Sequence, residues 1–276
     1  MGRPVCTWRN TKILIMESVY VIKIGGNIID DDALLSVFLQ KFAAIKSKKI
    51  LVHGGGKLAT RLAEKLGIPQ QLVDGRRITD AETLKIVTMV YAGYINKIIV
   101  SELQSLNCNA MGISGADGNS ILAHKRENPE INYGFAGDIE RVNAKWFIQL
   151  LETGISIVAS SITHDGKNQL LNTNADTIAQ EIAKSLSPHY EVTLVFGFEK
   201  SGVLMEMEDE KSVIKELRKS HYKDLINSKK IFAGMIPKLD NAFTAIDQGV
   251  HKVIIGKAEE LDHLIVGKSG TTISHE

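Results

Sequence analysis

Two short apolar runs that each end in consecutive glycines constrain the fold of this chain more than any other feature. Residues 19–24 lead into Gly25 and Gly26, and residues 50–52 lead into His53 and three further glycines. Longer amphipathic stretches separate these and later β-branched runs, and that alternation is typical of an α/β fold with a mainly parallel sheet. We therefore expect a three-layer αβα sandwich with helices on both faces of the sheet.

The positions of the other elements follow from the same alternation. We predict strands at residues 19–24, 50–52, 156–160, 191–195 and 252–255. We predict helices at residues 31–47, 57–66, 81–106, 144–153, 175–186 and 235–248. The segment between residues 110 and 142 is rich in Gly, Asn and Asp, which favours hairpins and loops around a pocket.

The elements are expected to form two lobes that share one sheet. Ser187 and Pro188 mark the boundary between an N-terminal lobe at residues 16–187 and a C-terminal lobe at residues 188–276. Residues 1–15 are expected to be a disordered N-terminal extension, because they lack both the apolar core and the cleavage site of a signal peptide.

Composition narrows the class of partner. The 276 residues carry 33 Lys plus Arg against 32 Asp plus Glu, so no global basic field favours nucleic acid or an anionic membrane. Cys6 and Cys108 are too few for a disulfide framework and lack the spacing of a zinc site. No stretch approaches the roughly 20 apolar residues of a membrane span. The sequence therefore favours a cytoplasmic protein with small-molecule partners.

The predicted helix at residues 81–106 has two unusual features. Thr79 and Glu82 have the spacing of a capping box, which predicts where the helix begins. Apolar residues then cover more than one stripe of the helix, which is more than a single contact with a sheet would bury. We expect a second partner surface on this helix, such as another subunit.

A lysine lies near the end of the first predicted strand. Lys23 stands in a run too uniformly apolar for an exposed edge, and a buried ammonium is costly without an anion nearby. The glycine turns at residues 25–26 and 54–56 free backbone N–H groups at the carboxyl end of a parallel sheet, where ligands bind in such folds. They predict two anion sites facing one pocket. The alternative is a snorkelling lysine beside ordinary tight turns.

Two further positions suit a ligand with a carboxylate or an amide. Arg77 precedes the predicted helix start at Thr79, so a guanidinium and a helix N-terminus would attract the same carboxylate. Asn172 lies just before the helix that Asn174 would cap, and its amide could hydrogen-bond a substrate. Asp176 falls in the first turn of that helix, where capping alone would also explain it.

Lys238 opposes the electrostatics of the helix that it begins. It follows Pro237, which fits the first helical position, and a lysine there opposes the helix dipole by roughly 0.3–1 kcal/mol. A phosphate at this helix start would reverse the effect, because the helix and the ammonium would both attract it. Lys238 is therefore predicted to contact a phosphoryl group, and the alternative is a plain exposed lysine.

Taken together, these motifs resemble the amino acid kinase family, in the branch that acts on N-acylated glutamate. The resemblance runs from about residue 19 to residue 273. The matching segments are KIGG at 23–26, VHGGG at 52–56, GRRIT at 75–79, LNTNAD at 171–176, GMIPK at 234–238 and GTTI at 270–273. Each segment is short, but their order and spacing are specific to that family.

The resemblance implies roles for individual residues. Lys23 and Lys238 would neutralise the phosphoryl group during transfer, and Asp176 would orient both lysines. The positions that would contact the phosphoryl group through backbone N–H groups are Gly25, Gly26 and Gly55. The positions that would bind the acyl-glutamate are Gly55, Gly56, Arg77 and Asn172.

The implied reaction is the ATP-dependent phosphorylation of the γ-carboxylate of N-acetyl-L-glutamate, giving N-acetyl-L-glutamyl 5-phosphate in arginine biosynthesis. Mg²⁺ would arrive with ATP, held by phosphate oxygens and water rather than by protein ligands. The resemblance also implies an arginine-insensitive homodimer, joined through the helix at residues 81–106. Residues 196–202 depart from the family pattern in the loop that contacts the nucleotide.

The nearest alternative is another kinase of the same family, acting on carbamate, aspartate, glutamate or a nucleoside monophosphate, and Arg77 and Asn172 with their flanking sequence argue against it. Two further alternatives remain open. N-succinyl-L-glutamate shares the carboxylates that Arg77 and Asn172 would contact, and the acyl pocket is expected around residues 107–119 and 133–138. A catalytically silent amino acid sensor could keep the same fold. Sensing would not require the triangle of one aspartate and two lysines.

Overall fold

The structure is a computed structural model that describes residues 16–73, 76–206, 209–228 and 235–275. The expected extension at residues 1–15, including Cys6, lies outside the described residues, as do Gly75 and Gly234 of the matching motifs.

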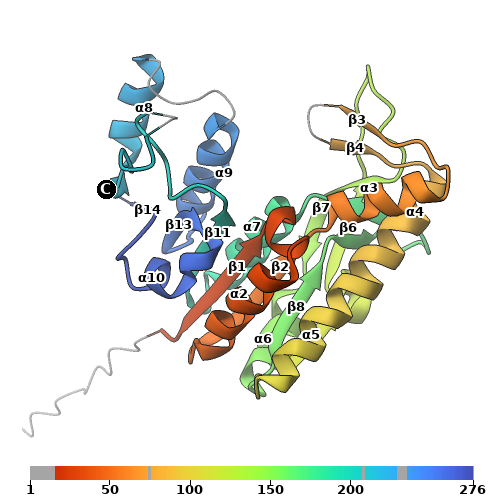
Figure 1. The fold of residues 1–276 in the computed structure, drawn as a ribbon, viewed down its shortest axis with the longest axis horizontal. Coiled ribbons are helices and arrows are strands. Elements are labelled where there is room, and N and C mark those ends of the chain that lie inside the picture. Colours follow the sequence, from red (N-terminus) through yellow and green to blue (C-terminus); the bar gives the residue numbers. More distant parts are fainter. Residues whose placement is uncertain (1–15, 74–75, 207–208, 229–234, 276) are drawn as a thin grey trace, which may run out of the picture.

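One eight-stranded sheet runs through the molecule (Figure 1). Its strands, in spatial order, are β12 (Glu216–Leu217), β14 (Thr271–Ser274), β13 (Lys252–Lys257), β11 (Glu191–Phe198), β1 (Ser18–Ile24), β2 (Lys48–His53), β8 (Ser156–Ser160) and β5 (Ala110–Ile113). All neighbours pair in parallel except β13 and β14, which are antiparallel. The predicted mainly parallel α/β fold is confirmed.

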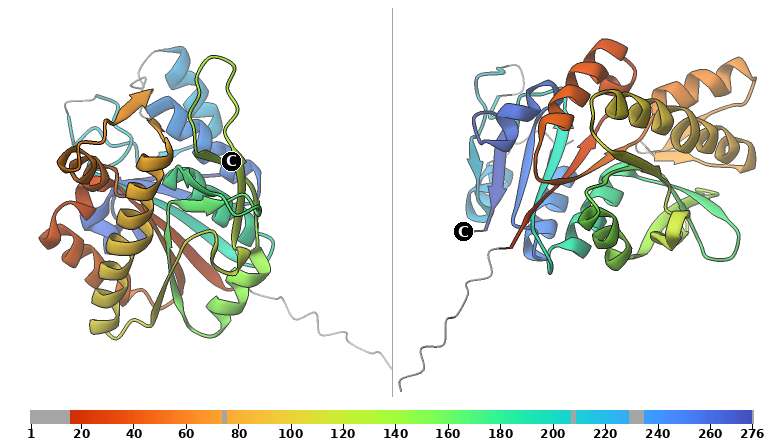
Figure 2. Two further views of the ribbon diagram at one scale, coloured as in Figure 1. Left: turned by 90° about the vertical axis from the view of Figure 1, so that its right-hand side faces the viewer. Right: turned by 90° about the horizontal axis from the view of Figure 1, so that it is seen from below.

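Helices cover both faces of this sheet, as the three views in Figures 1 and 2 show. One core lies under α6 (Ala144–Glu152), α7 (Ala175–Leu186), α8 (Lys219–Asn227) and α9 (Ile236–Asp247). The core of the opposite face lies under α2 (Asp32–Ala44), α3 (Gly56–Lys65), α4 (Ala81–Val87), α5 (Asn96–Ser105) and α10 (Leu261–Ile265). The central strands contribute to both cores because successive side chains point to opposite faces. In β1, Val19 and Val21 enter the first core, whereas Ile22 and Ile24 enter the second.

A small barrel and a hairpin stand beside the main sheet. The barrel closes through β6 (Ile121–Lys125), β7 (Ala136–Val142), β9 (Ile162–His164) and β10 (Leu170–Thr173). The hairpin pairs β3 (Gln71–Val73) with β4 (Arg76–Ile78), and in Figure 1 it stands above α3 and α4. These elements supply one wall of the cavity described below.

The long helix begins differently from the prediction. Asp80, not Thr79, is its N-cap, since the Asp80 carboxylate accepts a hydrogen bond from a backbone N–H of the first turn. Glu82 is exposed and pairs with Lys85, so the predicted capping box is wrong. In its middle, the π-helix η1 (Thr88–Ile95) separates α4 from α5.

The helical run Ala81–Ser105 is also long and apolar enough, by length and composition, to span a membrane. The expectation that no segment would approach that length was therefore wrong. Core helices of globular proteins pass the same test, and Ile99 and Leu103 of this run are fully buried in the core that it shares with α2, β5 and β8. The run packs as a core helix with one exposed apolar face.

Candidate active site

Lys23 and Asp176 form an ion pair at the carboxyl end of β1. The distance between Lys23 Nζ and Asp176 Oδ1 is 2.7 Å, and Lys23 is only 9% exposed. By the alternation along β1, Lys23 lies on the face of Val19 and Val21, where α7 packs. Asn174 caps α7 by accepting the backbone N–H of Asp176, which places that carboxylate in the first turn. Oδ1 makes no hydrogen bond within the described part of the chain, so charge rather than an aligned hydrogen bond holds the pair.

Lys238, at the start of α9, extends its side chain toward the ion pair of Lys23 and Asp176. Its Nζ lies 3.9 Å from the centroid of the Phe198 ring, and Lys23 Nζ lies 5.5 Å from the same centroid. Burial is the main cause that lowers the pKa of Lys238 below its usual value, while Asp176 raises it and Lys23 lowers it further. The structure thus brings together the three side chains that the sequence singled out from three distant segments.

The two glycine turns stand at helix starts for different reasons. Gly25 is the N-cap of the short helix α1 (Gly26–Ile29), and a Cβ at Gly25 or Gly26 would meet no protein atom closer than 3.7 Å. Gly55 is the N-cap of α3 with φ +154°, and a Cβ there would overlap Ile95 Cδ1 and lie 3.0 Å from Tyr91 Cδ1. Packing therefore dictates Gly55, whereas the first turn leaves open space above its backbone.

A buried pair holds the second turn in place. His53 Nδ1 lies 2.9 Å from the carbonyl oxygen of Gly54, and Asn96 Nδ2 lies 3.1 Å from His53 Nε2. Burial is the main cause that lowers the pKa of His53 to about 4, so the ring is neutral at pH 7. Nδ1 then donates to Gly54 while Nε2 accepts from Asn96, which also donates to the carbonyl of Val158. His53 lies in the core, and Asn96 was missed although an amide inside an apolar helix signals a buried partner.

A cavity of about 200 Å³ opens between the glycine turn of α3, the hairpin and the small barrel. All four residues predicted to bind acyl-glutamate line it, namely Gly55, Gly56, Arg77 and Asn172. Ala136 and Gly137 line it from the expected acyl segment at 133–138, whereas the expected segment at 107–119 contributes none of its lining residues. The cavity also reaches Asn174 and Ala175, which immediately precede Asp176.

Arg77 and Asn172 are joined through Thr79. Arg77 Nη2 donates to the carbonyl oxygen of Gly56 over 2.9 Å and to Thr60 Oγ1 over 2.8 Å. Thr79 Oγ1 donates to the carbonyl oxygen of Arg77 over 3.1 Å and accepts from Asn172 Nδ2 over 3.0 Å. Thr79, which was predicted to cap a helix, therefore connects Arg77 and Asn172 on two sides of the cavity.

A second arginine on the cavity was missed by the sequence analysis. Arg126 Nε lies 3.1 Å from each carboxylate oxygen of Asp138, and its guanidinium stands 5.6 Å from the Tyr133 ring centroid. Hydrogen bonding from Arg126 is the main cause that lowers the pKa of Asp138. Arg126 directly follows β6 and lines the cavity, and Asp138 of β7 pairs with it, so this cation of the cavity wall has a carboxylate partner.

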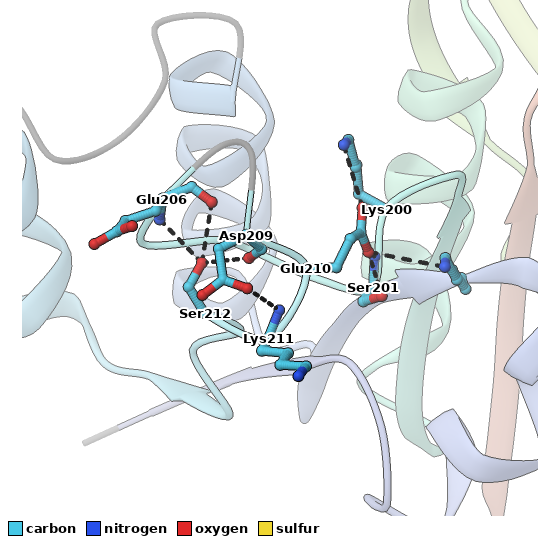
Figure 3. Close-up of polar contacts among 8 residues, drawn as sticks. Lys200, Ser201, Glu206, Asp209, Glu210, Lys211 and Ser212 are labelled. Atoms are coloured by element: carbon cyan, nitrogen blue, oxygen red, sulfur yellow. Dashed lines mark hydrogen bonds and ion pairs between the residues drawn. The ribbon is translucent and has the colours of Figure 1, made fainter.

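The segment that departs from the family pattern folds around one carboxylate (Figure 3). Ser201 Oγ donates to Glu210 Oε2 over 2.5 Å, and Lys200 Nζ lies 3.2 Å from Glu210 Oε1. The hydrogen bond from Ser201 is the main cause that lowers the pKa of Glu210 to about 2, with Lys200 adding to it. Lys257, at the end of β13, lies 3.8 Å from the same carboxylate. This loop is thereby fastened beside the carboxyl ends of β11 and β13.

In the part of the chain that the structure describes, no group of three or more His, Cys, Asp or Glu side chains is placed to hold a metal ion. The carboxylate of Asp176 forms its ion pair with Lys23.

Comparison with known proteins identifies relatives over nearly the whole chain. The family model described as "Amino acid kinase family" matches residues 18–257. An acetylglutamate kinase from Cytophaga hutchinsonii is 54% identical over 251 residues, which cover 91% of this chain and 95% of the relative. An acetylglutamate kinase from Parabacteroides distasonis is 52% identical over 246 residues, which cover 89% and 96% of the two chains.

Solved structures of low identity share the fold. N-acetylglutamate synthase from Neisseria gonorrhoeae, in complex with coenzyme A and N-acetyl-glutamate, has a TM-score of 0.79 at 18% identity. That alignment covers 94% of this chain and 60% of the synthase, which is the longer protein. Giardia carbamate kinase has a TM-score of 0.69 at 12% identity, with 95% and 99% of the two chains covered.

Proposed function

We propose, because this chain belongs to the amino acid kinase family, that it transfers the γ-phosphoryl group of ATP to the side-chain carboxylate of N-acetyl-L-glutamate. The product is N-acetyl-L-glutamyl 5-phosphate, an intermediate of arginine biosynthesis. One observation carries the proposal: the ammonium groups of Lys23 and Lys238 converge near Asp176, next to a cavity lined by Arg77 and Asn172.

The chemistry is a problem of charge. A γ-carboxylate, with a pKa of about 4.3, is already ionised at neutral pH and needs no general base. Its oxygen attacks the γ-phosphorus while the bond to the bridging β–γ oxygen breaks and ADP leaves. Both reactants are anionic, so positioning and cations supply most of the catalysis. Lys23 and Lys238 neutralise the phosphoryl oxygens, and Asp176 orients the two lysines.

Backbone groups and the cavity complete the site. The N–H groups of Gly25, Gly26 and Gly55 contact the phosphoryl group, and the open space at the first turn supports this role. Gly55 and Gly56 also bind the acyl-glutamate. Arg77 binds a carboxylate of this substrate, and Asn172 binds its amide or a carboxylate.

We assign the acyl-glutamate and dimer contacts to an N-terminal lobe, 16–187, and ATP to a C-terminal lobe, 188–276. Lys238 and the loop fastened by Glu210 belong to the second lobe, and the described cavity belongs to the first. Mg²⁺ accompanies ATP and neutralises phosphate charge. Phosphate oxygens and water would hold it, because Mg²⁺ usually keeps several waters and binds substrate phosphates.

A hydroxamate assay tests the proposal. Acyl phosphates react with hydroxylamine, so the purified chain with MgATP is expected to give hydroxamate from N-acetyl-L-glutamate, but little from L-glutamate, L-aspartate or carbamate. ADP release that matches hydroxamate formation would support the same conclusion. Ligand binding measured by calorimetry without any turnover would instead favour a catalytically silent sensor of this fold.

N-succinyl-L-glutamate is the second candidate substrate. Its acyl chain carries one carboxylate more than an acetyl group, and Arg76 and Arg126 line the cavity in addition to Arg77. Asp138 pairs with Arg126 and also interacts electrostatically with Arg76, so the geometry favours the neutral acetyl group. We expect kcat/KM for the acetyl substrate to exceed that for the succinyl substrate. The reverse order in the same assay would reassign the acyl group.

We also propose a homodimer joined through the exposed face of Ala81–Ser105. Met89, Tyr94 and Ile98 are 54%, 62% and 39% exposed on this run, and exposed apolar patches mark interaction surfaces. Tyr94→Glu is expected to give a monomer in sedimentation or light scattering, because it would bury a charge at the interface. Val266→Glu, at a 61% exposed position on α10's end, is the control and should remain dimeric. A wild-type monomer, or a dimeric Tyr94→Glu variant, would contradict this interface.

A further inference from the structure

We infer that Phe198 is a positioning residue for phosphoryl transfer, whose ring holds the ammonium groups of Lys238 and Lys23 toward one point. The inference rests on the proposed function, which assigns both lysines to the phosphoryl group. Phe198 lies in the segment where this chain departs from its family's pattern, and the sequence analysis gave it no role.

The strand register places the ring at the site. In the parallel pair of β1 and β11, Lys23 stands opposite Phe196, so Phe198 lies two residues further along, at the strand end. Residues two apart share a face, and Phe196 and Phe198 both pack on the core that includes α7 and α9. Asp176 lies in the first turn of α7 and Lys238 in the first turn of α9. Both side chains therefore meet Lys23 and Phe198 on one side of the sheet.

Packing fixes the plane of the ring. Phe198 stacks on Phe196 with centroids 6.1 Å apart and planes at 17°, and Phe196 is itself 5% exposed. Lys238 Nζ lies over this ring, 3.9 Å from its centroid, and Lys23 Nζ lies within the range of the same attraction at 5.5 Å.

The Phe198 ring can hold two ammonium groups that repel each other. Among the described residues, Asp176 forms its ion pair with Lys23, while it attracts Lys238 from a greater distance. Glu199 is close enough to raise the pKa of Lys238, but no ion pair joins the two among the described residues. A carboxylate in direct contact would hold Lys238 firmly but would cancel the charge meant for the phosphoryl group and repel that group. An aromatic face attracts a cation through its quadrupole and carries no net charge. It can therefore orient Lys238 without competing with an incoming anion.

The experiment compares Phe198→Leu, which removes the ring and keeps an apolar side chain, with Phe198→Tyr, which keeps the ring. We expect Phe198→Leu to lower kcat by about 3- to 30-fold, the range of a cation–π contact. The KM for acyl-glutamate should stay within about two-fold, because Phe198 does not line the substrate cavity. Phe198→Tyr should retain kcat within about two-fold of wild type.

Phe147→Leu is the matched control for packing. Phe147 is fully buried in the same core, on α6, and contacts Trp146 rather than a lysine. It should lose thermal stability and keep kcat. Wild-type kcat in Phe198→Leu, an equal loss in Phe198→Tyr, or the same loss in Phe147→Leu would overturn the inference. An inactive wild-type chain would instead refute the proposed function, so the two failures are distinguishable.

Discussion

Replacing Lys238 with alanine is expected to lower kcat by on the order of 10²- to 10³-fold, the effect of removing one preorganised charge from a transition state. Lys238 is half-buried near Lys23, has no ion pair within the described segments, and has a pKa that burial lowers. Its ammonium therefore contributes little to folding, and the melting temperature should change by only a few degrees. ADP release and thermal unfolding measured on the same preparation test both parts of this prediction.

The control for this variant is Lys219→Ala. Lys219 also stands at the start of a helix, α8, but it is exposed and pairs with Asp247. Its removal should leave kcat unchanged, because an exposed ion pair contributes at most about 1 kcal/mol to stability and nothing to catalysis. Turnover of Lys238→Ala within a few-fold of wild type would refute the assigned role, and a parallel loss in Lys219→Ala would point to a general effect on helix starts.

Elements with a strong local pattern were predictable from the sequence. The strand Ser156–Ser160 and the helix Ala175–Leu186 have the predicted bounds, and the other strands are longer by a few residues at their ends. In the first case a fully buried β-branched run ends at a turn. In the second, Asn174 caps a helix whose apolar residues recur at helical spacing. Information within about ten residues was sufficient for both.

Features decided by distant partners were not predictable. Thr79 and Asp80 are both good capping residues, and the choice between them depends on Asn172, whose amide uses the Thr79 hydroxyl from 93 positions away. The π-helix η1 presents Tyr91 and Ile95 to a glycine turn from another part of the chain. No local pattern contains either contact.

The residues of the candidate site also differ in whether the local sequence could reveal them. Lys23 and Lys238 could be singled out because each violates a local rule, one by standing in an apolar strand and the other by opposing a helix dipole. Phe198 obeys every local rule, since an aromatic at the end of a buried strand is ordinary. Only the register of β1 with β11 and the position of α9 bring its ring under the two ammonium groups. A residue whose environment is normal in sequence and unusual in space can be found only from the structure.

Substituting Gly55 with alanine is expected to damage both folding and substrate binding. The new Cβ would overlap Ile95 Cδ1 and crowd Tyr91, in a core whose overpacking costs about 1–3 kcal/mol. The φ of +154° adds strain of about 1–3 kcal/mol for a residue with a side chain. For a chain of this size, the melting temperature should fall by on the order of 5–15 °C.

Gly54→Ala is the matched control, because it changes the neighbouring residue. A Cβ at Gly54 would lie 3.9 Å from Ala175 Cβ and 4.0 Å from Ser161 Oγ, which are ordinary contacts, and its φ needs no glycine. We expect Gly54→Ala to melt within a few degrees of wild type. Where Gly55→Ala still folds, the displaced turn should raise the KM for acyl-glutamate by at least about ten-fold, since Arg77 is bonded to the Gly56 carbonyl in the same turn. If both variants melted alike and bound substrate alike, the packing of η1 against this turn could not be what shapes the substrate cavity.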